Sequence, residues 1–185
     1  MNLGRIPAKT ASLEPHREAL VDVPNGRRIT FGDLDERVRR LANALRDDLG
    51  LSKGDRVAIL SKNCIQYMEV FYGVARCGLI ALPLNWRLSD AEMLRLLEDG
   101  EPRVIVVSSE YREMAERLRQ QIHIEHWFIF ADEPEDDYER LLAAAASNEP
   151  VAAGSVSADD PVLILYTGGT TGLSKGALHT HHSLY

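Results

Sequence analysis

Short, uninterrupted apolar runs are the feature that most constrains how this chain of 185 residues can fold. They occupy residues 57–60, 104–107, 127–130 and 162–165, and segments with helical periodicity separate most of them. A run that is apolar at every position suits a strand covered on both faces, as happens in a parallel sheet with helices packed on each side. The sequence therefore predicts an α/β fold with a mostly parallel sheet and helices on both faces.

Local signals place the remaining elements. Further short strands are expected at residues 19–22, 28–30 and 79–82, and helices at about residues 31–49, 65–76, 89–98, 111–121 and 138–145. Thr30 with Asp33, and Ser89 with Glu92, have the spacing of capping boxes at helix starts, and Gly50 suits a helix end. The helix at 65–76 is apolar nearly all round, which predicts that it is buried.

The composition changes between Ala131 and Asp160, where acidic residues, an alanine run, Pro150, Gly154 and several serines replace the dense apolar segments. We interpret this stretch as a surface excursion that holds one helix and a flexible connection. Residues 1–185 are thus expected to form one partial domain. Its parts are an α/β core at 1–130, the excursion at 131–160, and a strand, a glycine-rich loop and a following element at 161–185.

Charge and composition exclude several classes of protein. Lys and Arg number 21 against 28 Asp and Glu, giving a net charge of −7, and an acidic chain without a basic run is a poor candidate for binding nucleic acid. No apolar run approaches the roughly 20 residues that span a bilayer, and the start lacks the apolar core of a secretory signal. A cytoplasmic location follows. Cys64 and Cys77 form no metal-binding pattern and are interpreted as small packing residues.

The chemistry is carried by residues 166–176, Tyr-Thr-Gly-Gly-Thr-Thr-Gly-Leu-Ser-Lys-Gly, which follow the last apolar run directly. Glycines let the backbone approach a ligand closely, consecutive backbone N–H groups form a concave anion site, and the lysine adds a positive charge. Neither the Walker pattern nor the dinucleotide G-x-G-x-x-G spacing fits, because the residues around Lys175 and the glycine positions differ. A turn without a ligand stays open as an alternative.

Residues 166–176 resemble the phosphate-binding signature of the adenylate-forming superfamily, whose usual form is Y-T-S-G-T-T-G-x-P-K-G. This chain departs from it at Gly168, where serine is usual, and at Ser174, where proline is usual. Residues 29–34, 75–85 and 137–142 resemble other family segments in the expected order. The stretch Asn85-Trp86-Arg87-Leu88 is similar to fatty-acyl and related CoA ligases. We expect Asn85 and Arg87 to satisfy loop backbone, and Trp86 to pack.

The resemblance implies an ATP-dependent carboxylic acid–CoA ligase, a long- or medium-chain fatty-acid–CoA ligase in particular. Such an enzyme forms an acyl-adenylate from the acid and ATP, then transfers the acyl group to CoA. It also implies a site for the ATP phosphates at Thr167, Gly168, Gly169, Thr170, Thr171, Gly172 and Lys175, with Mg²⁺ at Thr170. His181 would lie near the acyl group. A metal site at His179, His181 and His182 is the weaker interpretation, because no carboxylate or cysteine lies nearby in the sequence.

The matching segments correspond to about the first third of a family member, and the carboxy-terminal domain is expected to be absent. We therefore assign no certain catalytic residue in this chain. We also expect that the 185-residue chain alone does not synthesise acyl-CoA. Other interpretations stay open: an aryl-CoA ligase, an amino-acid adenylation domain, or a non-catalytic α/β module that binds a nucleotide or another anion. The acyl chain length is not readable, and a homodimer is left open.

Overall fold

A six-stranded sheet forms the centre of the computed structural model, which describes residues 1–131, 136–167 and 175–185. The strand order is β6-β5-β3-β4-β7-β8. The strands are β3 (Arg56–Leu60), β4 (Ile80–Pro83), β5 (Pro102–Ser108), β6 (His126–Phe130), β7 (Pro161–Thr167) and β8 (Lys175–Thr180). The neighbouring strands are parallel except β7 and β8, which are antiparallel. The predicted α/β fold with a mostly parallel sheet is confirmed.

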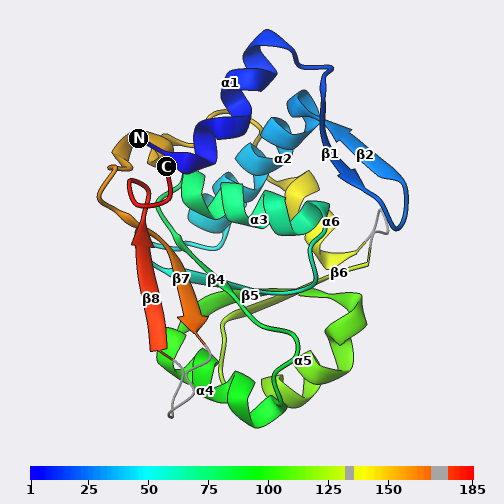
Figure 1. The fold of residues 1–185 in the computed structure, drawn as a ribbon, viewed down its shortest axis with the longest axis vertical. Helices are drawn as coiled ribbons and strands as arrows, with labels where there is room; N and C mark the ends of the chain where they lie inside the picture. Colours follow the sequence, from blue (N-terminus) through cyan, green and yellow to red (C-terminus); the bar gives the residue numbers. More distant parts are fainter. Residues whose placement is uncertain (132–135, 168–174) are drawn as a thin grey trace.

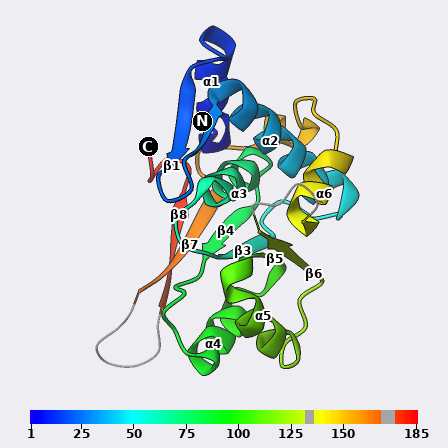
Figure 2. The ribbon, with the colours of Figure 1, turned by 90° about the vertical axis from the view of Figure 1, so that its right-hand side faces the viewer.

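Helices cover both faces of this sheet (Figures 1 and 2). One face carries α1 (Ile6–Leu13), α2 (Phe31–Asn43), α3 (Ile65–Arg76) and α6 (Asp137–Ala144), and the other carries α4 (Asp90–Gly100) and α5 (Arg112–Arg119). Short helical turns are η1 (Leu3–Arg5), η3 (Ser109–Tyr111) and η4 (Val151–Ser155). Within the described ranges, no helix is both long and apolar enough to cross a membrane.

The continuous apolar runs supply both layers of the core. Val57 and Ile59 of β3 pack with the α2, α3 and α6 side, whereas Ala58 and Leu60 pack with the α4 and α5 side. Successive side chains of a strand point to opposite faces, so a strand buried on both faces needs an apolar residue at every position.

The strands predicted near residues 19–22 and 28–30 form a sheet of their own. β1 (Glu18–Asp22) and β2 (Arg27–Thr30) pair as an antiparallel hairpin separate from the central sheet. Thr30 then caps α2: its hydroxyl accepts from the Asp33 N–H while the Asp33 carboxylate accepts from the Thr30 N–H. Ser89 and Glu92 form the same arrangement at the start of α4. Both predicted capping boxes are confirmed.

The helix expected at residues 31–49 is not uniform. Regular α-helix ends at Asn43, and a π-helical turn, η2 (Ala44–Asp48), carries the chain onward. The Asn43 side chain donates to the carbonyl oxygens of Ala146 and Asn148, so contacts distant in sequence hold the chain at this change. Gly50 follows with a φ of 66°, which glycine adopts easily.

The helix α6 joins the core through a buried ion network, although it lies in the stretch interpreted as a surface excursion. Arg37 of α2 donates to both carboxylate oxygens of Glu69 on α3 and of Glu139 on α6, at 2.6–3.0 Å. The Tyr138 hydroxyl also donates to Glu69. Tyr138 and Glu69 are fully buried. One guanidinium thus ties three helices together.

Candidate functional site

The hairpin of β7 and β8 places the two ends of the predicted phosphate loop side by side. Thr167, the last residue of β7, is the register partner of Lys175, the first residue of β8, and both are exposed. Five predicted site residues, Gly168, Gly169, Thr170, Thr171 and Gly172, lie outside the described residues, as does Ser174. The structure therefore brings together Thr167 and Lys175 of the predicted set.

These two residues lie at the edge of the sheet where ligands bind in open α/β folds. β7 runs parallel to β4, and β4 is parallel to β3. Thr167 therefore lies at the carboxyl ends of these parallel strands, and crevices outside the carboxyl ends are the usual ligand sites of such sheets. The two described residues that flank the predicted phosphate-binding segment therefore both lie at this edge.

Tyr166 anchors β7 one residue before this edge. Its hydroxyl donates to a carboxylate oxygen of Asp99 on α4. Burial and the neighbouring Asp99 carboxylate both raise the pKa of Tyr166, so its phenol stays neutral at physiological pH. Gly176 faces Tyr166 across the hairpin, and a Cβ there would lie 3.3 Å from the tyrosine ring. Asp99 of α4 and Gly176 of β8 therefore both lie against Tyr166, the residue directly before Thr167.

A second cluster of polar and aromatic residues lies at the carboxyl ends of neighbouring strands. Lys62 follows β3, Trp86 and Arg87 follow β4, and Glu110 follows β5. The Lys62 ammonium is 2.5 Å from a Glu110 carboxylate oxygen and 5.1 Å from the Trp86 ring centroid, while the Arg87 guanidinium carbon is 4.0 Å from the same centroid. The hydrogen bond to Glu110 raises the pKa of Lys62.

The sequence analysis did not predict that Lys62, Trp86, Arg87 and Glu110 lie together. The expectation for Asn85 is confirmed, since its side-chain oxygen accepts from the Arg87 N–H at 3.1 Å. Trp86 packs against the core as expected, and in addition carries two cations near its ring. The available signal was positional: polar residues that directly follow parallel strands converge at one edge. The two cations lie where the negative face of the aromatic ring attracts positive charge.

His181 lies at the opposite end of β8 from Lys175. Six residues at about 3.4 Å each put it roughly 20 Å from Lys175. Its side chain is fully buried, and its Nδ1 accepts from the backbone N–H of Leu3 at 3.1 Å. Burial lowers the pKa of His181, which keeps the ring neutral. This histidine ties the N-terminal segment to the sheet, and its proposed place near an acyl group stays a prediction.

The other histidines and the cysteines do not form a candidate metal site in the described part of the chain. His179 is half-buried on β8 and His182 is exposed. Among the residues whose placement is described, no group of three or more His, Cys, Asp or Glu side chains could hold a metal ion. Cys77 is buried, and its burial raises the pKa of the thiol to about 12, which disfavours the reactive thiolate.

Comparison with known proteins identifies the family. The model of the AMP-binding enzyme family matches residues 8–185, nearly the whole chain. The chain belongs to the AMP-binding enzyme family. A curated relative in this family, the long-chain-fatty-acid–CoA ligase FadD13 of Mycobacterium tuberculosis, is 34% identical over 188 residues, which cover 100% of this chain and 36% of that protein. The feruloyl-CoA synthase of an Amycolatopsis species is also 34% identical, over 98% of this chain and 34% of its own length.

Solved structures agree with the family match. The crystal structure of the N-terminal domain of FACL13 from Mycobacterium tuberculosis, with an inhibitor bound, superposes with a TM-score of 0.86 at 32% identity. The match covers 97% of this chain and 44% of that one. The chain therefore has the fold of the N-terminal part of adenylate-forming enzymes. It spans only about a third of the length of the curated AMP-binding relatives it matches.

Proposed function

We propose that this chain is the ATP phosphate-binding part of a carboxylic acid–CoA ligase. The observation that carries the proposal is the pairing of Thr167 with Lys175 at the carboxyl edge of the sheet, at the two ends of the family's phosphate-binding signature. The two curated relatives described above are named as a CoA ligase and a CoA synthase, which supports the same reaction type.

The proposed reaction has two steps. A carboxylate oxygen of the acid attacks the α-phosphorus of ATP, the bond to the bridging oxygen breaks, and pyrophosphate leaves with both electrons of that bond. The thiol of CoA then attacks the carbonyl carbon of the acyl-adenylate, AMP leaves, and the thiol proton passes to solvent. Negative charge grows on the departing pyrophosphate in the first step, so preorganised donors there lower the barrier.

In this proposal the residues of the loop hold the β- and γ-phosphates. Lys175 supplies a positive charge, and the Thr167 hydroxyl is a neutral donor at the other end of the loop. The proposed set also includes Gly168, Gly169, Thr170, Thr171 and Gly172. Threonine hydroxyls and phosphate oxygens are the hard oxygen ligands that suit Mg²⁺, so Thr170 is proposed to share the ion with ATP. When bound, Mg²⁺ would neutralise phosphate charge.

The identity of the acid and the setting of the enzyme are also part of the proposal. The Asn85-Trp86-Arg87-Leu88 stretch favours a fatty acid, while the equal identity to a feruloyl-CoA synthase keeps an aryl acid as the second candidate. We propose a cytoplasmic location, where ATP and CoA are supplied. His181 as an acyl-site neighbour and a homodimer both stay predictions; light scattering would test the latter.

Calorimetric titration of the chain with MgATP tests the loop assignment. We expect Lys175→Ala to weaken binding at least about tenfold, because a charge-assisted contact to phosphate is lost. Arg112→Ala, which removes one positive charge from the exposed start of α5, is the matched control and should leave the affinity unchanged. Equal affinity in the two variants would rule out the loop as the phosphate site.

A pyrophosphate-release assay on the natural gene product tests the reaction. Pyrophosphate release is expected to need both ATP and a carboxylic acid, and a panel of fatty and aryl acids would identify the substrate class. Release by the 185-residue chain alone would contradict our expectation that it is inactive. Release of inorganic phosphate instead of pyrophosphate would contradict the ligase proposal.

A further inference from the structure

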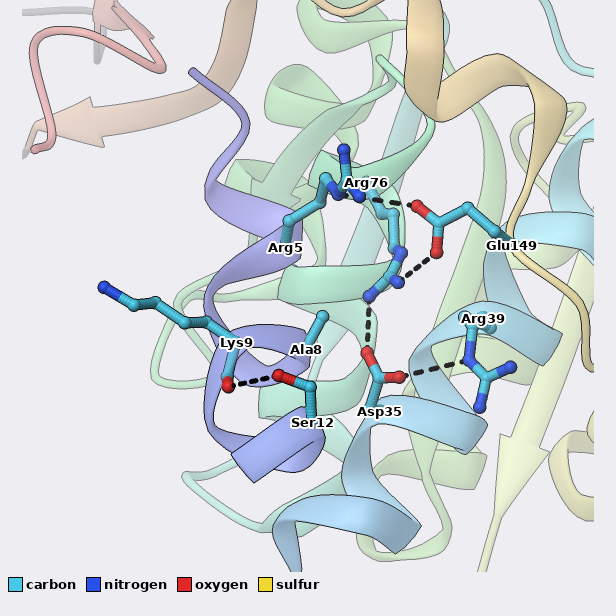
Figure 3. A pocket seen from close by; sticks show the side chains of 8 residues that line it. All are labelled: Arg5, Ala8, Lys9, Ser12, Asp35, Arg39, Arg76 and Glu149. Atoms are coloured by element: carbon cyan, nitrogen blue, oxygen red, sulfur yellow. Dashed lines mark hydrogen bonds and ion pairs between the residues drawn. The ribbon is translucent and has the colours of Figure 1, made fainter. Parts of the chain in front are cut away.

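A charged pocket lies between α1, α2 and the loop after α6, away from the hairpin (Figure 3). Its volume is about 680 Å³, within the range of small-molecule sites. It is lined by Arg5, Ala8, Lys9, Ser12, Asp35, Arg39, Arg76 and Glu149. Arg76 ends α3 shortly before the amino end of β4, whereas Thr167 is the last residue of the parallel strand β7, at its carboxyl end. The pocket and the phosphate loop are therefore at opposite edges of the sheet.

Arg76 is the deepest residue of this pocket, with a side chain only 1% exposed. Its guanidinium donates to Asp35 Oδ1 at 2.6 Å, to the Gly4 carbonyl oxygen at 3.3 Å, and to Glu149 Oε2. Its Nε is buried without an acceptor in the described part of the chain. A buried cationic donor without a partner costs free energy, and the positive charge of this guanidinium favours an anion in the pocket beside it.

Each of the two carboxylates of the pocket lies within ion-pair distance of two arginines. The second oxygen of Asp35 is 3.1 Å from Arg39 Nε, and the second oxygen of Glu149 is 3.6 Å from Arg5 Nε. In Figure 3, Asp35 lies between Arg76 and Arg39, and Glu149 lies between Arg5 and Arg76. All four carboxylate oxygens therefore already face a cation.

Positive charge remains after this pairing. The lining contains four cationic side chains and two carboxylates. Lys9 makes no ion pair within the described ranges, and its flexible side chain extends away from the others in Figure 3, free to turn toward a ligand. The Arg5 side chain is 59% exposed, and among the described residues its one ion pair is the long contact to Glu149. A local excess of two positive charges stands out in a chain whose net charge is −7.

We propose that this pocket binds a small phosphate-bearing anion. Planar guanidinium groups match the geometry of phosphate oxygens and can hold two of them at once, and a lysine ammonium adds a mobile charge. Arg5 and Lys9 would contact the ligand directly, while Arg76 provides the fixed positive base of the pocket. The shared chemistry is the phosphate group, carried by inorganic phosphate or by a nucleoside monophosphate.

Calorimetry with the full 185-residue chain tests this site. The background is Lys175→Ala, which removes the lysine of the other proposed phosphate site, and chloride keeps the ionic strength constant. Sodium phosphate and AMP are titrated separately. Saturable binding of both with similar affinity assigns the site to the phosphate group itself, and tighter binding of AMP assigns it to a nucleotide. No saturable binding of either ligand at millimolar concentrations would overturn the proposal.

Three substitutions in that background locate the binding. Arg5→Ala and Lys9→Ala should each weaken it roughly fivefold, as expected for partly exposed charged contacts, while Arg112→Ala should not change it. Glu149→Gln removes a competing carboxylate and should tighten binding severalfold, provided that a melting curve shows the variant folded; if it is not folded, the Arg5 and Lys9 variants decide. Equal affinity in the Arg5, Lys9 and Arg112 variants, or weaker binding by folded Glu149→Gln, would overturn the proposal.

Discussion

The hydroxyl of Tyr166 donates to Oδ2 of Asp99 at 2.5 Å, and this bond joins the strand that leads into the proposed phosphate loop to the end of α4. The next residue, Gly100, packs closely against the sheet, because a Cβ there would lie only 2.6 Å from a methyl group of the buried Leu82. Close packing at Gly100 thus brings α4 near enough to the sheet for Asp99 to reach β7.

Tyr166→Phe should therefore lower the free energy of unfolding by about 1 kcal/mol, the usual net value of one hydrogen bond. Asp99→Asn weakens the same bond, so the double variant should lose less than the sum of the two single losses. Urea unfolding followed by circular dichroism measures all three. Strict additivity would show that the two side chains do not interact in solution.

The sequence predicted the elements whose signals are local. Apolar runs such as residues 57–60 and 104–107 became strands because burial on both faces requires them to be apolar throughout. Thr30 and Ser89 began helices because each capping box is made within four residues. In contrast, the change from α- to π-helix after Asn43 has no local signal, since the apolar spacing continues through Leu49 and the partners of Asn43 lie more than 100 residues away.

Part of the site could also be predicted, for a similar reason. Thr167 and Lys175 are joined by a short segment, so their convergence follows from one hairpin. The cluster around Trp86 depends on three strand ends meeting at one edge, which needs the strand order of the sheet. The hydrogen bonds of Glu69 could not be predicted either, because its partners Arg37 and Tyr138 lie 32 and 69 residues away in the sequence.

Gly4→Ala tests the attachment of the N-terminal segment. A Cβ on Gly4 would lie 2.1 Å from the backbone nitrogen of Arg76 and 2.5 Å from the carbonyl oxygen of Tyr72. Backbone atoms of a buried helix cannot move aside easily, so we expect a loss of about 2–3 kcal/mol in the free energy of unfolding. The control is Gly154→Ala, where no atom lies within 4 Å of the new Cβ and φ is not in the left-handed range. If both variants unfold at the same urea concentration, the N-terminal segment does not pack on α3 in solution.

His181 should make stability depend on pH. Burial lowers its pKa in the folded chain; the charges of the N-terminus and Lys53 act in the same direction, and Asp160 opposes them. The unfolded chain, with an ordinary histidine pKa near 6.5, therefore binds the proton more readily. Stability should fall as the pH drops from about 6.5 toward the folded pKa, and should not depend on this group at higher pH.

The measurement for His181 is the free energy of unfolding at pH 7.5 and at pH 5.5. His181→Asn keeps an acceptor for the Leu3 N–H but cannot bind a proton, so this variant should lose less stability between the two values than the parent chain. His123→Asn changes an exposed histidine and should behave like the parent. An unchanged pH dependence in His181→Asn would show that His181 does not titrate differently in the folded chain.

Arg37 provides the strongest test of the helix arrangement. Its hydrogen bonds to Glu139 and Glu69 outweigh burial and raise its pKa, so it stays charged. Arg37→Met would leave Glu69, whose side chain has 0% exposure, without its cation, and breaking a buried pair in this way costs about 3–5 kcal/mol. The control Arg117→Met breaks an ion pair with Asp90 whose arginine is 52% exposed, and this loss should be much smaller because solvent screens an exposed pair. Adding Glu69→Gln to Arg37→Met removes the unpaired charge and should restore part of the loss. The free energy of urea unfolding is measured for the parent chain and the three variants. If Arg37→Met loses no more stability than Arg117→Met, Glu69 is hydrated in solution and this network does not hold the three helices together.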